Sequence, residues 1–227
     1  MLPGPDKYVN IHAHRRASSM DEWVLTNVLA QDYPPDGYED AQYSVGLHPW
    51  HIEGFDVELL LKKVQLATEN IKVLALGETG LDKAIKTPMK LQLQIFEAQV
   101  ELAEHTDLAL IIHAVKSFNE LKDFVKVHQP HVPMIIHGFR GGTRVAEEMI
   151  KAGFYLSLGS PLLVSATLAE VAAMLPLEKL FLESDEDDVE IQLLYKRVAE
   201  IRGISKKLLR TKINENATKI LQRQVDF

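Results

Sequence analysis

From residue 73 onward, short runs of apolar residues alternate with longer stretches in which apolar residues recur at helical spacing. This alternation is typical of the βαβ units that build a parallel sheet. It predicts strands at residues 73–77, 108–113, 133–137, 154–158 and 179–183, separated by helices near 88–105, 117–128, 143–151 and 165–174. Two further helices are expected near residues 189–201 and 205–221. Five consecutive βα units account for this part of the chain.

The first 70 residues are less regular, with strands predicted at residues 7–12, 23–28 and 42–47. Only eight residues separate His14 from Trp23, which is too few for a crossover helix with its turns. We therefore predict an α/β fold, a TIM-type (β/α) barrel in which the first β/α unit is reduced or the second strand is displaced. Because 227 residues can bury one large core, a single barrel domain over residues 1–227 is expected.

Several of the apolar runs end in a residue that can bind a metal ion. These residues are His12 and His14 in VNIHAH, Glu78 in VLALGETGLD, His113 in LALIIH, His137 in PMIIH and Asp185 in LFLESD. The chemistry of β/α barrels lies at the carboxyl ends of the strands, so residues scattered along the chain would converge there. Imidazole and carboxylate ligands without thiolate suit zinc, manganese, iron or magnesium. The pattern indicates a catalytic rather than a structural metal site.

Each of these residues, considered alone, could have a structural role that does not involve a metal ion. His12 and His14 lie two apart in a strand and face the same side, yet such a pair is also common as exposed or hydrogen-bonded histidines. Glu78 could bridge two cations, or it could cap the following helix. His113 and His137 at equivalent positions of successive βα units favour a shared site over chance. Asp82 is expected to be a loop or capping carboxylate.

Other residues at the strand ends are candidates for contacts with a substrate. His48 could contact a substrate oxygen, and Trp50 could stack on a base or sugar, although a packed loop explains both equally well. Lys116, Arg140 and Arg144 follow histidine-bearing strands and could contact phosphate, or they could simply be solvated. No role is assigned to His51, His105, His128 and His131, which lie away from the predicted strand ends.

Composition narrows the functional classes. The chain contains 46% hydrophobic and 25% charged residues and no cysteine, so disulfides and thiolate ligands are excluded. No apolar run approaches the roughly 18 residues of a membrane span, and the first residues do not resemble a secretory signal. We expect no membrane partner, a cytoplasmic location and, by default, a monomer. The net charge of −7 disfavours general coating of nucleic acid, although cations bound in the site would offset part of it.

Six segments taken together resemble, in order and spacing, the motifs of the TatD family of metal-dependent hydrolases in the amidohydrolase superfamily. The segments are NIHAH, GLHPW, GETGLD, IIHAVKS, HGFRGG and ESD, and the resemblance spans about residues 8–220. It implies a TIM-barrel hydrolase with a dinuclear site that holds two divalent ions, zinc, magnesium or manganese. On this pattern one ion would be held by His12, His14, Glu78 and Asp185, and the other by Glu78, His113 and His137.

The chain departs from the family pattern in three places. Asn10 stands where many members have an acidic residue, and Val115 stands where many have an arginine, with Lys116 as the adjacent cation. A lysine is a point charge and cannot replace the bidentate fork of arginine. The region between His14 and Tyr43 is also shorter than usual. Hydrolysis is therefore better supported than DNA as the substrate.

We expect a divalent-metal-dependent hydrolase, most simply a phosphodiesterase or deoxyribonuclease of TatD type acting on DNA or a small phosphodiester. A metal-activated water near Glu78 would pass its proton toward Asp185 and attack phosphorus, which gives these two residues the catalytic roles. Two alternatives are an amidohydrolase-like deacylase or lactonase on a small carbonyl substrate, and a catalytically inert, metal-retaining binding module. A basic, aromatic-lined groove would favour nucleic acid, and a small closed apolar pocket would favour the carbonyl substrate.

Overall fold

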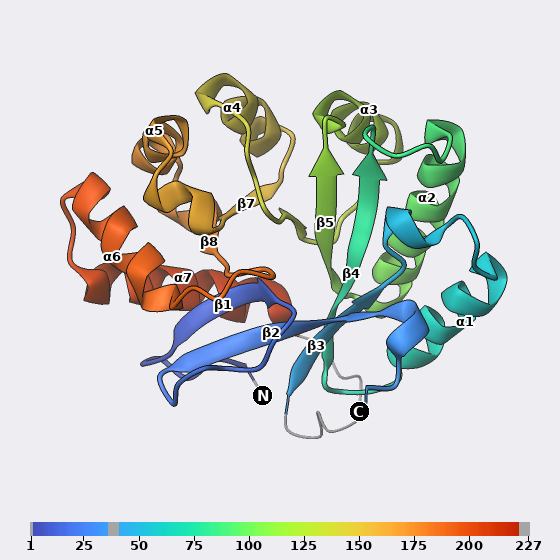
Figure 1. Ribbon diagram of the computed structural model, residues 1–227, viewed down its shortest axis with the longest axis horizontal. Coiled ribbons are helices and arrows are strands. Elements are labelled where there is room, and N and C mark those ends of the chain that lie inside the picture. The colour runs from blue at the N-terminus through green and yellow to red at the C-terminus, as the bar shows by residue number, and fades with distance from the viewer. Residues whose placement is uncertain (1, 36–40, 223–227) are drawn as a thin grey trace.

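Eight parallel strands form a single sheet in the order β1 to β8 in a computed structural model that describes residues 2–35 and 41–222. The strands are β1 Tyr8–Ala13, β2 Glu22–Leu29, β3 Gln42–Gly46, β4 Val73–Asp82, β5 Ala109–Val115, β6 Met134–Ile136, β7 Tyr155–Leu158 and β8 Leu180–Leu182. The sheet curls into a barrel, with helices around its outer side (Figure 1). The predicted TIM-type barrel is confirmed.

The barrel closes where the first strand meets the segment after the last one. Ala13 forms a parallel bridge with Asp185. The backbone N–H of Asp185 donates to His12 O at 3.1 Å, and the N–H of His14 donates to Asp185 O at 3.2 Å. These two bonds fix residues from opposite ends of the sequence side by side at the carboxyl end of the barrel.

The helices of the second half agree with the predicted pattern to within a few residues. They are α2 Met89–Thr106, α3 Phe118–His128, α4 Thr143–Lys151, α5 Ala166–Met174, α6 Ile191–Arg202 and α7 Lys206–Leu221. The sequence analysis did not identify α1, Val57–Ala67. Its signal was nonetheless present, because Leu60, Val64 and Ala67 are buried at helical spacing and Asp56 caps the first turn.

The first β/α unit is indeed reduced. Residues 14–21 contain no helix, and β2 pairs in parallel with both β1 and β3, so the second strand is not displaced. Between β2 and β3 the described residues contain only a short 3₁₀ turn, Ala30–Asp32. The described parts of the connections from β1 to β2 and from β2 to β3 therefore supply no α-helix, whereas β1 itself packs against α6 and α7.

One strand is longer than the sequence pattern predicts. β4 continues to Asp82, five residues past the predicted end at residue 77, so Glu78 lies within the strand rather than just after it. Gly77 and Gly80 have φ values of 143° and 145°, and a Cβ at either position would collide with the backbone of β5. Glycine is needed at both positions because two strands approach closely.

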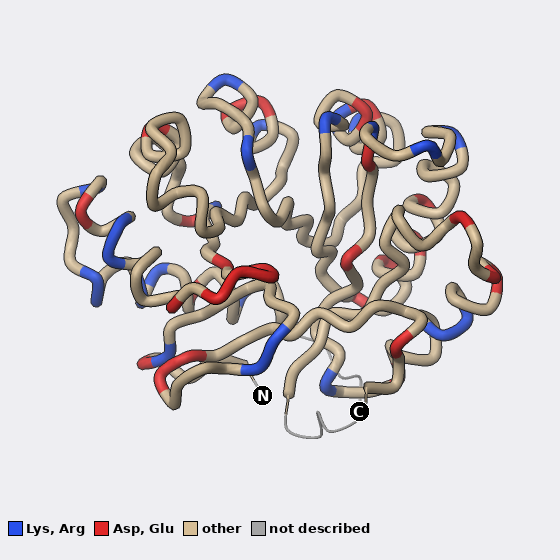
Figure 2. The backbone as a smooth tube through the Cα atoms, in the orientation of Figure 1, with Lys and Arg blue, Asp and Glu red and all other residues tan. Residues whose placement is uncertain are grey.

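The described segments contain no helix that combines the length and the apolar character required to span a membrane. Charged side chains are distributed over the surface, and acidic residues are concentrated in the segment between β8 and α6 (Figure 2).

Candidate metal centre

Glu78 lies at the centre of the carboxyl-terminal face of the barrel, and its two oxygens face different groups of residues. Its side chain is buried, and Oε2 lies 3.5 Å from His12 Nε2 and 3.4 Å from His14 Nε2. Asp185 completes this first group, with Oδ1 at 3.4 Å from His12 Nε2 and 3.6 Å from His14 Nε2. The bridge that closes the barrel places Asp185 next to the two histidines.

The spacing within this first group matches a metal coordination shell. For ligands at about 2.1 Å from zinc, the edges of a tetrahedron are roughly 3.4 Å long. The four distances of 3.4–3.6 Å between the histidine nitrogens and the carboxylate oxygens are close to this value. Both ring nitrogens of His12 are buried and have no hydrogen-bond partner among the described residues. Buried polar atoms rarely lack a partner, so this donor set fits a bound cation.

The other oxygen of Glu78 faces the second group. Oε1 lies 2.7 Å from His137 Nε2, 3.3 Å from His113 Nδ1 and 3.4 Å from His48 Nε2. All three histidines are buried. The structure thus brings together all six residues predicted to bind metal, and it adds His48 to their surroundings.

Asn27 on β2 holds Glu78 in place. The backbone N–H of Glu78 donates to Asn27 Oδ1 at 2.9 Å, and Asn27 Nδ2 donates to Glu78 Oε2 at 3.4 Å. Ser44 on β3 donates its hydroxyl to the same Asn27 Oδ1 at 3.1 Å. Both the backbone and the carboxylate of Glu78 are therefore anchored by the neighbouring strands.

The two histidines of the second group each contact a further buried carboxylate. His113 Nε2 lies 3.2 Å from Asp82 Oδ2, and His137 Nδ1 lies 3.4 Å from Glu183 Oε1. Asp82 also accepts the N–H of Ala84, in line with the expected capping role, but its contact with His113 places it beside the centre. Neither carboxylate was proposed as part of the site from the sequence.

His48 presents a hydrogen-bond donor to the site. Its Nδ1 accepts the backbone N–H of Trp50 at 3.1 Å, so in the neutral ring the proton is on Nε2, the atom that faces Glu78. Burial lowers the pKa of His48, which keeps the ring neutral at pH 7. His48 is accordingly suited to contact an anionic oxygen rather than to bind a cation.

Both carboxylates at the centre are ionised at neutral pH. Burial alone would raise the pKa of Glu78, but the histidines around it, His137 foremost, hold that pKa well below its usual range. Burial also opposes ionisation of Asp185, yet the nearby His12 ring, 3.4 Å away, lowers its pKa to about 2. Against the opposing effect of burial, Glu78 and Glu183 raise the pKa of His137 well above its usual value. Protons on the histidines balance the negative charge that a bound cation would balance instead.

A cavity of about 320 Å³ opens onto these residues. It is lined by His14, Leu29, His48, Trp50, His51, Glu78, His113, His137, Asp185 and Glu186. The indole of Trp50 is 59% exposed, while its Nε1 is fixed by a 2.7 Å hydrogen bond to Asp82 Oδ2. The ring therefore stands at the mouth in a fixed position.

The model of the family of TatD related DNases matches residues 20–222. The chain belongs to the TatD family of metal-dependent hydrolases. The metal-dependent hydrolase YjjV of Escherichia coli is 29% identical over 180 residues, which cover 77% of this chain and 67% of YjjV. The deoxyribonuclease Tat-D of Schizosaccharomyces pombe is 27% identical over 210 residues, 84% of this chain and 67% of the relative. The chain thus matches about two thirds of the length of these TatD proteins.

The fold agrees with solved structures of the TatD family. The crystal structure of YjjV superposes with a TM-score of 0.83 at 21% identity and covers 96% of this chain and 99% of YjjV. A TatD-family hydrolase from Entamoeba histolytica superposes with a TM-score of 0.74 at 17% identity, over 95% of this chain and 98% of that one. These likenesses establish the shared barrel.

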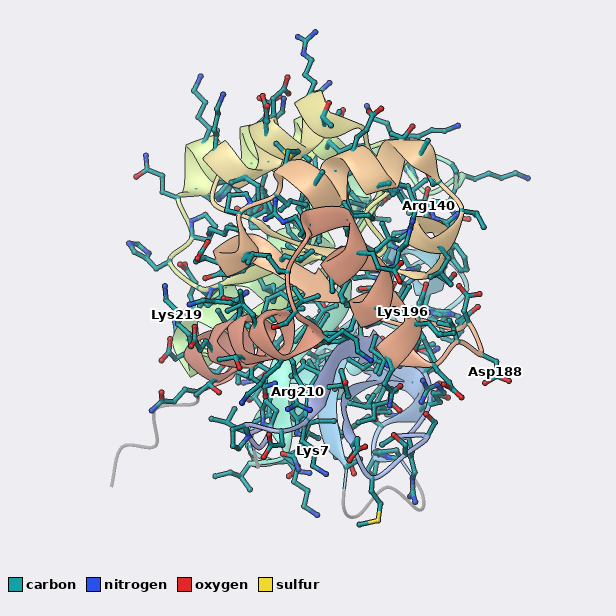
Figure 3. All side chains as sticks on the ribbon, turned by 90° about the vertical axis from the view of Figure 1, so that its left-hand side faces the viewer. Lys7, Arg140, Asp188, Lys196, Arg210 and Lys219 are labelled. Atoms are coloured by element: carbon teal, nitrogen blue, oxygen red, sulfur yellow. The ribbon has the colours of Figure 1, made fainter. Side chains whose placement is uncertain are left out.

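The basic residues expected to contact a TatD substrate do not line the cavity. Lys116 is exposed and follows β5. Arg140 is exposed and borders a separate small cavity of about 10 Å³ beside Glu183 and Asp185. Arg140 lies at the same edge of the molecule as Asp188 (Figure 3). The residues that line the cavity over the metal centre include no lysine or arginine.

Sequence reasoning missed several residues that surround the centre. Glu183 could have been found, because it precedes Asp185 by two positions in the same motif. His51 was assigned no role, yet it lines the cavity directly after the His48 motif. Asn27 and Leu29 had no signal, since nothing in a lone apolar strand indicates which of its residues faces a carboxylate 51 positions away.

Proposed function

We propose that this chain is a phosphodiesterase, most simply a deoxyribonuclease, that uses two divalent ions, zinc, magnesium or manganese. One observation carries the proposal: the two oxygens of Glu78 face two separate groups of histidines at metal-ligand spacing. A carboxylate in this position can bridge two cations and reduce their mutual repulsion. The first ion would be held by His12, His14, Glu78 and Asp185, and the second by Glu78, His113 and His137.

When bound, the ions supply positive charge for phosphate oxygens and lower the pKa of bound water from about 15.7 to near 7. Asp185 is suited to accept the proton of the attacking water. Its side chain is 36% exposed, so water reaches it, and its low pKa keeps it ionised. Its place beside His12 and His14 sets the proton acceptor next to the first ion group.

His48 and Trp50 are assigned to the substrate. The Nε2–H of His48 is aimed at the centre and can donate to a phosphate oxygen. The exposed ring of Trp50 can stack on a nucleobase beside the reacting phosphate. Lys116 and Arg140 stay candidate phosphate contacts for the part of a substrate that extends beyond the cavity.

The names of the relatives support a nucleic acid substrate, since one of them is a deoxyribonuclease. Neither the family match nor these relatives favour a deacylase, a lactonase or an inert binding module. The chemistry of a phosphodiester also suits the site, because the histidines and carboxylates would hold two cations near its oxygens and the neutral His48 ring offers them an N–H donor.

The proposal is tested with protein stripped of metal by a chelator and refilled with Mg²⁺, Mn²⁺ or Zn²⁺. We expect cleavage of labelled single-stranded DNA, or of a chromogenic phosphodiester, that returns with one of these ions and is absent in the Glu78→Gln variant. A folded, metal-binding protein that cleaves neither substrate with any ion would contradict the nuclease proposal. A parallel assay on esters and lactones distinguishes the carbonyl alternative.

A further inference from the structure

Each histidine assigned to the second ion is held between Glu78 and a second carboxylate. The ring of His113 is placed with Nδ1 at 3.3 Å from Glu78 Oε1 and Nε2 at 3.2 Å from Asp82 Oδ2. The ring of His137 is placed with Nε2 at 2.7 Å from Glu78 Oε1 and Nδ1 at 3.4 Å from Glu183 Oε1. In both cases the nitrogen that faces away from Glu78 meets a carboxylate.

We propose that Asp82 and Glu183 are positioning residues for the second ion, which hold His113 and His137 with their unprotonated nitrogens directed at the metal. The inference rests on the ligand set of the proposed function. A carboxylate beside one ring nitrogen keeps the proton there, and the other nitrogen then offers its lone pair. The first group differs, because Nδ1 of His12, the ring nitrogen that does not face Glu78, has no carboxylate partner among the described residues.

Asp82 is itself immobile. It is 2% exposed, and its backbone N–H donates to Gln92 Oε1 at 2.7 Å while Gln92 Nε2 donates to Asp82 O at 3.0 Å. Its Oδ1 accepts the N–H of Ala84 at 2.7 Å, and its Oδ2 accepts the indole N–H of Trp50 at 2.7 Å. The carboxylate therefore cannot turn away from His113. It also joins a ligand of the second ion to the aromatic ring at the mouth of the cavity.

Glu183 is held in a comparable way. Its side chain is fully buried, and Oε1 accepts the backbone N–H of Gly138 at 2.6 Å in addition to facing His137. The backbone N–H of Glu183 donates to Leu158 O at 3.2 Å, so the neighbouring strand β7 fixes the position of Glu183 along the barrel axis. Glu183 Oε2 is buried without a hydrogen-bond partner in the described part of the chain. Burying a carboxylate with one unpartnered oxygen lowers the stability of the fold. The position of Glu183 is therefore better explained by its contact with His137 than by a contribution to stability.

The test measures zinc binding rather than turnover. Wild type and the variants Asp82→Asn, Asp82→Ala, Glu183→Gln and Glu183→Ala are titrated with Zn²⁺ against a chromophoric chelator. We expect two binding events in the wild type and a selective weakening of one of them, by about 10- to 100-fold, in every variant. The alanine variants should be weaker than the amide variants, because Asn and Gln keep a hydrogen-bond acceptor for the ring.

Glu97→Gln is the matched control. Glu97 Oε1 lies 3.3 Å from His128 Nδ1, a carboxylate–histidine pair between α2 and α3 and away from the metal centre. This variant should bind both zinc ions like the wild type. Thermal unfolding without metal checks that each variant is folded.

Nitrogen-edited NMR of the zinc-loaded protein supplies a second readout. It should show the ring proton of His113 on Nε2 and that of His137 on Nδ1, with the first signal perturbed in Asp82→Asn and the second in Glu183→Gln. Variants that bind both ions like wild type, or that lose both events in proportion to their thermal stability, overturn the inference. If the expected binding pattern holds and no phosphodiester is cleaved, the inference stands and the proposed substrate fails. A wild type that binds a single ion overturns both.

Discussion

Asp185 adopts a left-handed backbone conformation, with φ at 53°. Asparagine and aspartate tolerate this region because their short polar side chains bond locally, whereas other residues pay for it in strain. The residue therefore combines two demands: it presents a carboxylate to His12, and it turns the chain after β8 so that its backbone bridges to β1. Replacing Asp185 with asparagine separates these two roles, because asparagine tolerates the same backbone conformation but carries no charge.

Asp185→Asn should fold like the wild type and lose turnover by about 100-fold or more, because it removes the proposed proton acceptor. Asp185→Ala should lose turnover similarly and also lose about 1 kcal/mol more of unfolding free energy than Asp185→Asn, from backbone strain. Steady-state kinetics and urea unfolding measure the two effects. Wild-type turnover in Asp185→Asn would show that another group takes the proton.

Trp50 offers a second test at the level of a single side chain. Trp50→Leu should raise KM for single-stranded DNA by about 5- to 100-fold, with a smaller effect on kcat, because stacking of a base on an aromatic ring contributes about 1–3 kcal/mol. Trp50→Phe keeps an aromatic ring but loses the N–H bond to Asp82. The KM of this variant should lie between the KM of the wild type and that of Trp50→Leu. Equal KM values for the Phe and Leu variants would argue against stacking.

At the scale of elements, the loop that replaces the first helix is held by a buried polar network. Glu22, the first residue of β2, accepts hydrogen bonds from Arg15 at 3.1 Å, from Asn10 at 2.9 Å and from the N–H of Ser18 at 2.6 Å. Asn10 also donates to Ser184 Oγ at 2.8 Å and accepts the Ser184 N–H at 3.0 Å. An acidic residue at position 10 could not donate and would face the Glu22 carboxylate. The departure from the family pattern thus follows from this network.

Glu22→Gln should lower the free energy of unfolding by about 1–3 kcal/mol at pH 7, because it leaves buried donors without a charged acceptor. Burial opposes the charge on Glu22, but hydrogen bonds from Arg15, Asn10 and Ser18 lower its pKa below the usual value. The stabilisation is thus complete above the unfolded pKa of about 4.3 and is lost as pH falls through the lower folded pKa. Urea unfolding should show a smaller difference in unfolding free energy between the wild type and Glu22→Gln at pH 3 than at pH 7.

Glu58→Gln is the control for this experiment. Glu58 forms an exposed pair with Lys62 one helical turn away, and such pairs contribute little. The unfolding free energy of the Glu58→Gln variant should differ from that of the wild type by less than about 0.5 kcal/mol at either pH. A loss equal to that of Glu22→Gln would show that general charge, rather than the network, determines stability.

The elements from residue 73 onward could be predicted from sequence, because strands and helices of βα units differ in the spacing of their apolar residues. The convergence of the candidate ligands could be predicted for the same reason, since the ends of parallel strands meet on one face of a barrel. The extension of β4 past Gly77 could not be predicted, because the close approach of β5 that requires glycine is a property of three dimensions. The contact of Asn27 with Glu78 depends on the same kind of packing. The monomeric state and the cytoplasmic location stay predictions.

At the scale of the whole molecule, the charge distribution constrains how a polyanion is held. The net charge is −7, the segment after β8 is acidic (Figure 2), and the residues lining the cavity include no lysine or arginine. A phosphate would thus be held by the ions, by His48 and by no more than a few peripheral cations. Binding of DNA then releases few counterions.

We expect KM for single-stranded DNA to depend weakly on monovalent salt at a fixed divalent concentration. Each lysine or arginine that neutralises a phosphate contributes a slope of about 0.7 on logarithmic axes, so the slope should stay below about 1.5. Measurements of KM between low and moderate KCl check this expectation. A slope above about 3 would indicate a basic track that guides the strand outside the cavity. Lys116→Ala and Arg140→Ala would then locate it.

The bridge between Ala13 and Asp185 determines when the metal centre can assemble during synthesis of the chain. The first ion group combines His12 and His14 from the end of β1 and Glu78 from β4 with Asp185 from after β8, so it cannot assemble while the ribosome still holds residue 185. The ligands of the second group all lie at or before residue 137, so weaker loading there can begin on a partial barrel, before Glu183 is in place beside His137. During synthesis, the capacity to load metal should therefore appear in two stages, and the later stage reports that the ring of strands has closed.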